Sequence, residues 1–156
     1  MANTQSMCTS FMSELMTATH NFGTAPVRAA STADTFKAAL YLASATINAS
    51  TTAYTATGEV TGTGYTAGGV TVTNATAPTS TNTSSTAGTA YWTPSASITY
   101  TSVTLTTAFD CVLIYNSTQS NKAVSVHTFG SQTVTAGTFT LTMPANAAGT
   151  ALLNLA

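Results

Sequence analysis

The sequence predicts a mainly β fold: an antiparallel β-sandwich or jelly-roll-like barrel of seven to nine short strands, preceded by an N-terminal arm with a short helix. Three observations favour this fold class. Apolar and polar residues alternate from about residue 36 onward, which is the period of a strand with one buried face. Threonine, a β-branched residue that favours strands, is abundant. Turn residues separate the apolar runs at the roughly 8–12-residue spacing of all-β domains.

The first element of the chain is expected to be a helix between Ser6 and about Ala18, because its apolar residues recur with the helical period. Two interpretations of the apolar face remain open. A methionine-rich face suits an adaptable contact with a partner protein, and the same face also suits packing against the chain's own domain. The candidate partner-contact residues are Met7, Phe11, Met12, Leu15 and Met16. We therefore divide the chain into an arm, residues 1–30, and a single β domain, residues 31–156.

The β domain is expected to contain several short strands. Their expected ranges are 36–42, 60–65, 70–73, 98–101, 103–106, 109–115, 124–127, 138–141 and 151–155. A slip in the apolar phase between Tyr100 and Val103 predicts a β-bulge there. Gly-containing sequences at 129–131 and 136–137 are typical of turns. The stretch from about 74 to 89 has no periodicity and no large apolar residue, and we expect a long exposed Thr/Ser-rich loop.

Charge is scarce: the 156 residues include 3 Lys or Arg and 4 Asp or Glu, with a net charge of −1. This composition excludes nucleic-acid binding through phosphate neutralisation and attraction to an anionic membrane surface. No apolar run approaches the ~20 residues of a membrane-spanning helix. A hydroxyl-rich β surface is cheaper to desolvate than one rich in Lys or Glu. We therefore expect protein partners, in a homo-oligomer or a multi-copy assembly.

The N-terminal residues carry no Lys or Arg and precede no apolar run of the kind that a secretory signal needs. Cys8 and Cys111 are too far apart in sequence for a typical metal motif. We expect two buried thiols, and a single disulfide between the arm and the body is the alternative.

The residues of enzyme chemistry are too few and too scattered to predict a catalytic site, a cofactor or a metal, so we expect a protein that is not an enzyme. The glycines of 62–69 superficially match a dinucleotide loop, but their spacing is wrong and turn or bulge glycines are favoured. His127 alternates with Val124 and Val126, which indicates a structural role. Asp34 is expected at the entrance of a strand, close to Lys37. We expect the few charges to be paired, with Glu59 and Asp110 as candidate partners of Arg28 or Lys122.

Trp92 is expected to be a core anchor rather than a residue that stacks on a ligand. A carbohydrate-binding module would need a row of exposed aromatic side chains. The sequence offers candidates for such a row, although it shows no platform: Tyr54, Tyr65, Tyr91, Trp92 and Tyr100.

Several of these segments resemble small virion proteins of tailed bacteriophages. The resemblance covers about residues 30–73 and 97–155, and is carried by Asp34-Thr35-Phe36-Lys37-Ala38-Ala39-Leu40-Tyr41, 51–60, 62–69, 109–115, 129–130 and 134–139. It implies a structural component of the virion, assembled in the cytoplasm of the host bacterium. A head decoration or cement protein bound to the major capsid protein is the first hypothesis. A tail, head–tail connector or fibre component is the second, and a carbohydrate-binding β module is the third.

Overall fold

The computed structural model of the chain describes residues 3–16, 18–22, 33–73, 77–81 and 88–155. Eight strands and one helix occur within this part. In chain order they are β1 (Ser6–Met7), α1 (Thr9–Met16), β2 (Phe36–Leu42), β3 (Val70–Thr71), β4 (Thr79–Ser80), β5 (Ala90–Trp92), β6 (Ile98–Asn116), β7 (Lys122–Leu141) and β8 (Leu153–Leu155).

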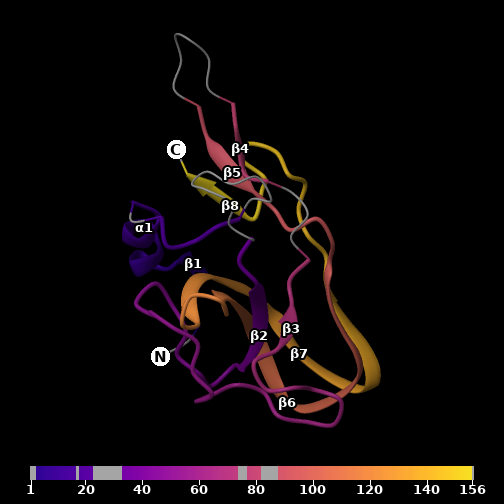
Figure 1. Cartoon of the computed structure of the whole chain (residues 1–156). Helices are drawn as coiled ribbons and strands as arrows, with labels where there is room; N and C mark the ends of the chain where they lie inside the picture. Colours follow the sequence, from indigo (N-terminus) through magenta and orange to yellow (C-terminus); the bar gives the residue numbers. More distant parts are fainter. Residues whose placement is uncertain (1–2, 17, 23–32, 74–76, 82–87, 156) are drawn as a thin grey trace.

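The strands form two antiparallel sheets. The large sheet has the order β1-β7-β6-β2-β3, and the small sheet has the order β4-β5-β8. In Figure 1, β6 and β7 form a long curved ribbon that bends around β2 and β3, while the small sheet lies beyond one end of it. The predicted fold class is confirmed: the protein is mainly β, with a sandwich-like arrangement of two antiparallel sheets and one short helix. The described strands do not close into a barrel.

The prediction that all strands are short is wrong for β6 and β7, which span 19 and 20 residues. The expected strands at 98–101, 103–106 and 109–115 are one continuous strand with irregular register. The bulge expected between Tyr100 and Val103 is confirmed, and Ser102 within it has a positive φ of 53°. Gly130 and Ala136, expected in turns, instead lie at register shifts inside β7. Bulges bend a strand without ending it, so turn residues there do not separate two strands.

Two other expected elements differ from the structure. Residues 60–65 form no named strand, and only Thr63 makes an isolated bridge, to Thr104. Gly64 has a positive φ of 77°, which interrupts the extended backbone, while Gly62 lets the segment approach Thr104 closely: a Cβ on Gly62 would lie 2.1 Å from the carbonyl oxygen of Thr104. The expected loop at 74–89 contains β4, which pairs with β5, and residues 74–76 and 82–87 lie outside the described part.

β2 is buried on both faces rather than on one. Ala38, Ala39, Leu40 and Tyr41 each have 0% exposure. The segment that follows β2 in sequence folds back over it: the Tyr41 hydroxyl donates to the Thr55 carbonyl at 2.6 Å. A strand covered on both faces no longer needs the polar alternation of a half-buried strand. β2 therefore forms the centre of the core together with the adjacent half of β6.

The two thiols are free and buried, as the first of the two interpretations predicted. Burial raises the pKa of Cys8 to about 11 and that of Cys111 to about 12. Both side chains therefore remain protonated near neutral pH and act as small apolar core residues.

Candidate partner-binding surface

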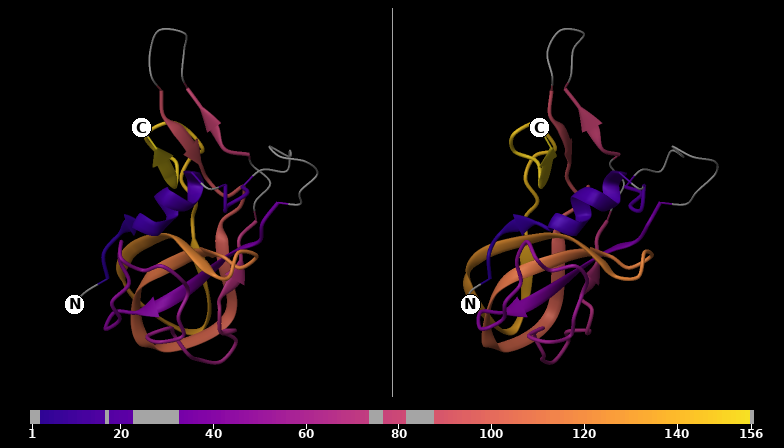
Figure 2. Two further views of the ribbon diagram at one scale, coloured as in Figure 1. Left: turned by 60° about the vertical axis from the view of Figure 1, so that its left-hand side comes forward. Right: turned by 90° about the vertical axis from the view of Figure 1, so that its left-hand side faces the viewer.

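The N-terminal segment, residues 3–22, packs along one side of the body. β1 pairs with β7, and Ser6 and Met7 face Val126 and Ser125. Helix α1 is shorter than the expected range of 6–18 because β1 takes up its first turn. In the views of Figure 2, α1 lies between the curved β6/β7 ribbon and the small sheet. The segment thus joins the two sheets of the molecule.

The five candidate partner-contact residues have different environments. Phe11 has 1% exposure and belongs to the protein's own core, so it is not accessible to a partner in this arrangement. Met7 and Leu15 are partly buried against that core. Met12 is 47% exposed, and it is one of two large apolar side chains, with Leu155, that are exposed among the described residues. The side chain of Met16 lies outside the described part.

An apolar groove lies between α1 and the small sheet, with a cavity of about 80 Å³. Its walls come from the helix, from the segment after it and from strands β5 and β8. The lining residues are Phe11, Leu15, Phe22, Pro78, Ala90, Tyr91, Trp92, Leu153 and Leu155. We call this site the helix–sheet groove. The helical periodicity of the N-terminal residues predicts the helix side of the groove, whereas no sequence pattern predicts that residues 90–92 and 153–155 lie together, because they are short runs far apart in the chain.

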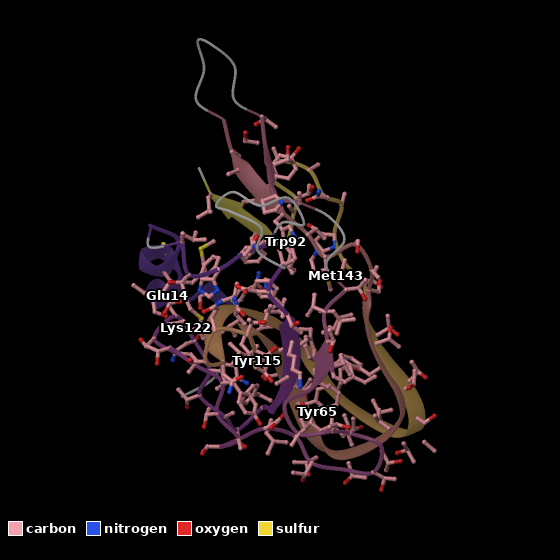
Figure 3. All side chains as sticks on the ribbon, in the orientation of Figure 1. Glu14, Tyr65, Trp92, Tyr115, Lys122 and Met143 are labelled. Carbon is pink, nitrogen blue, oxygen red and sulfur yellow. The ribbon has the colours of Figure 1, made fainter. Side chains whose placement is uncertain are left out.

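A chain of aromatic rings supports the floor of the helix–sheet groove. The Phe22 ring stacks on Phe36 with centroids 4.4 Å apart and meets Trp92 edge-on at 4.7 Å. Trp92 is 2% exposed, which confirms the prediction that it is a core anchor. Figure 3 shows Trp92 where the small sheet meets the body. Aromatic pairs in these geometries add about 0.5–1.5 kcal/mol each beyond their burial.

A cluster of polar side chains, which we call the polar junction, attaches α1 to the body. It consists of Glu14, His20, Asp34, Asn116 and Lys122. Glu14 accepts hydrogen bonds from Lys122 Nζ at 2.5 Å and from His20 Nε2 at 2.7 Å. Figure 3 shows Glu14 and Lys122 side by side at the foot of the helix. Burial alone would raise the pKa of Glu14, but the hydrogen bonds from Lys122 and His20 and the positive charge of Lys122 lower it below its usual value of 4.5.

Asn116 fixes the hydrogen-bonding role of the His20 ring in the polar junction. Its Oδ1 accepts from the backbone N–H groups of Thr118 and Gln119, so its Nδ2 must be the end that faces His20 and Asp34. Nδ2 donates to Asp34 Oδ2 at 2.7 Å and faces His20 Nδ1 at 3.1 Å. His20 Nδ1 is therefore an acceptor, and the ring carries its proton on Nε2, which points at Glu14.

The charge pairs expected from sequence are wrong where the structure describes them. Lys122 pairs with Glu14, not with Glu59 or Asp110. Glu59 instead accepts from the hydroxyls of Tyr54 and Tyr65. Hydrogen bonding to neutral groups satisfies a buried carboxylate without a cation, and composition cannot indicate that choice.

The other two acids also have uncharged partners. Asp110 accepts from Asn3 Nδ2 at 2.6 Å. Asp34 binds the side chain of Asn116 and the backbone N–H of Asn21, not Lys37. Arg28, the other expected cation, lies outside the described residues.

Other chemistry-bearing residues lie outside the helix–sheet groove and the polar junction. His127 Nε2 lies 2.9 Å from Ser125 Oγ, a pairing that resembles a base and its nucleophile. Ser125 is only 1% exposed, so a substrate could not reach it in this arrangement. Burial lowers the pKa of His127 to about 4, which keeps its ring neutral near pH 7. Gly64, Gly68 and Gly69 have positive φ values, which confirms that they are turn residues.

The structure gives no sign of a metal centre or a membrane helix in the part it describes. The described His, Cys, Asp and Glu residues include no group of three or more that could hold a metal ion. Among the same residues, no helix has the length and apolar character that a membrane span requires.

Comparisons of the chain with protein-family models, with curated proteins and with solved structures find no match.

Proposed function

We propose that this chain is a structural component of a bacteriophage virion, and specifically a head decoration or cement protein that binds the major capsid protein. The observation that carries the proposal is the helix–sheet groove, with Met12 exposed on the helix and Leu155 exposed at its rim. An apolar side chain of the capsid protein would fill this groove. The sequence resemblance to virion proteins supports the same assignment.

The charge distribution also supports a wide protein contact. Residues 60–109 and 123–156 contain no Asp, Glu, Lys or Arg. Both strands that line the groove lie within these stretches. Binding would therefore remove hydroxyl-bearing and apolar side chains from water without burying an unpaired charge, which is the costly step in many interfaces.

A tail, head–tail connector or fibre position is the alternative within the same class, since the same surface would serve there. A carbohydrate-binding module is less well supported, because four of the five candidate aromatic side chains are buried or hydrogen-bonded within the protein, and the fifth, Tyr91, lines the apolar groove. Trp92 and Tyr100 are each 2% exposed. The hydroxyls of Tyr54 and Tyr65 bind Glu59.

Quantitative mass spectrometry of purified virions tests the proposal. A decoration protein covers the head, so we expect on the order of hundreds of copies per particle, as symmetric repetition of one contact implies. About a dozen copies or fewer would move the protein to the tail or connector. Its absence from particles would overturn the virion assignment.

A variant in the groove tests the surface itself. Leu155→Asp places a charge at the apolar rim, and we expect at least about a tenfold loss of binding to particles that lack the protein. Thr133→Asp is the matched control, because Thr133 is exposed on β7 and does not line the groove. Equal binding by both variants would exclude the helix–sheet groove as the contact.

A further inference from the structure

The N-terminal segment, residues 3–22, contacts parts of the chain that are far away in sequence. Asn3 binds Asp110, and β1 pairs with residues 125 and 126 of β7. The Cys8 N–H donates to the Val124 carbonyl at 3.0 Å, and Glu14 pairs with Lys122. These contacts require that the segment reach the surface of the body, but they do not require that segment and body belong to the same chain. The segment and the body are therefore related as a ligand and its receptor.

The match between the segment and the body is specific. Phe11 and Phe22 insert into the core, and Phe22 stacks on Phe36 of β2. The charges are complementary, with negative Glu14 on the segment and positive Lys122 on the body. In a chain with so few ionisable side chains, three charged residues and one of the two histidines meet at the polar junction. Such a junction recognises this one segment better than it would an unrelated apolar peptide.

The chain length between segment and body permits docking on a neighbour. Asn21 and Asp34 are bonded to each other at the two ends of the connection, and 13 residue steps separate them. A connection of that length can span up to about 45 Å. A domain of this size has a radius of gyration of only about 15 Å. Docking within one chain has an effective concentration of order millimolar, which neighbours in a multi-copy particle can match.

We infer that residues 3–22 form an exchangeable arm, and that the body surface that holds it binds the same arm of a second copy of this chain. Every contact described above would be kept, with the arm and the body supplied by different copies. The exchange would link neighbouring copies without any new interface. Its occurrence in a particle rests on the proposed function, whereas the exchange itself can be tested on the purified chain.

The experiment uses two full-length chains that each carry one cysteine, both in a Cys8→Ala, Cys111→Ala background. One chain carries Met7→Cys and a mass tag, and the other carries Ser125→Cys. Met7 and Ser125 face each other across β1 and β7, and facing Cα atoms about 4.5–5.5 Å apart suit a disulfide. The chains are mixed in denaturant, refolded together at about 1 mM and then oxidised. We expect a disulfide-linked heterodimer, seen as one mass on a non-reducing gel and by mass spectrometry.

The matched control replaces Ser125→Cys by Thr133→Cys, an exposed position on β7 that does not face the arm. Heterodimer yield several-fold above this control supports the exchange, and a yield equal to it overturns the inference. A single chain with both Met7→Cys and Ser125→Cys, refolded dilute, should form an internal disulfide. If that disulfide does not form, the arm does not dock as described and the inference also fails. Neither result depends on virion binding, so failure here and failure of the proposed function are distinguishable.

Discussion

Two carboxylates that lie mostly out of solvent, Glu59 and Glu14, have opposite kinds of surroundings. Glu59 accepts three hydrogen bonds of 2.7 Å, from the hydroxyls of Tyr54 and Tyr65 and from the Gly68 backbone N–H. All three donors are uncharged and lie within nine positions of Glu59. Burial and the hydrogen bond to Glu59 raise the pKa of Tyr54 to about 12, so its hydroxyl remains a donor.

Glu14 has partners of the other kind. It binds the Lys122 ammonium, 108 positions away, and the His20 ring. The comparison separates two uses of a buried acid. Local neutral donors make Glu59 an integral part of the body, whereas a remote cation makes Glu14 a reversible attachment point for the arm. Changes at Glu59 should therefore affect the whole fold, and changes at the polar junction should affect the arm.

The largest effect is expected for Glu59→Ala, which would leave three donors without their acceptor. An unsatisfied buried group costs about 1–3 kcal/mol, so we expect the free energy of unfolding to fall by about 3 kcal/mol or more. Urea unfolding followed by circular dichroism measures this change. Glu59→Gln keeps one acceptor oxygen and should lose less. A loss under about 1 kcal/mol for Glu59→Ala would show that the three donors find other partners.

The same comparison shows what the sequence could and could not predict. The alternating pattern predicted the mainly β class, the strand at 36–42 and the bulge after Tyr100, because these depend on local periodicity. The two long strands were not predicted, since bulge residues and turn residues have the same composition. The polar junction brings together residues from four separate segments, and no pattern in one sequence indicates such a meeting.

An intermediate effect is expected at Glu14, and it depends on pH. The folded pKa of Glu14 is lowered below 4.5, so folding favours its charged form. Its contribution is therefore fully present above pH 4.5 and is lost as the pH falls through the folded pKa. Hydrogen exchange of the arm amides should accelerate as the pH is lowered in this range, after correction for the intrinsic rate. In Glu14→Gln, arm exchange should already be faster at pH 7.

The difference in arm exchange rate between the wild-type protein and Glu14→Gln isolates the contribution of Glu14. His127, whose pKa is lowered to about 4, titrates in the same range but does so in both proteins, so its effect cancels. That difference should shrink toward zero below the folded pKa of Glu14. Amides of β2, beyond the arm, should show a much smaller difference between the two proteins. An equal change in exchange rate for amides of the arm and of the body would contradict the prediction that the polar junction affects the arm alone.

The smallest effect is expected for Lys122→Gln, because the Lys122 side chain is 39% exposed and solvent screens its charge. We expect the free energy of unfolding to change by less than about 1 kcal/mol. Salt distinguishes this ionic contribution from packing, since the Debye length falls to about 3 Å at 1 M. The difference in hydrogen-exchange protection of the arm between wild type and Lys122→Gln should narrow at 1 M NaCl. The difference in the free energy of unfolding between wild type and Glu59→Ala should not change with salt. If both differences respond equally to salt, Glu14 and Glu59 do not differ as ionic and neutral hydrogen-bond partners would require.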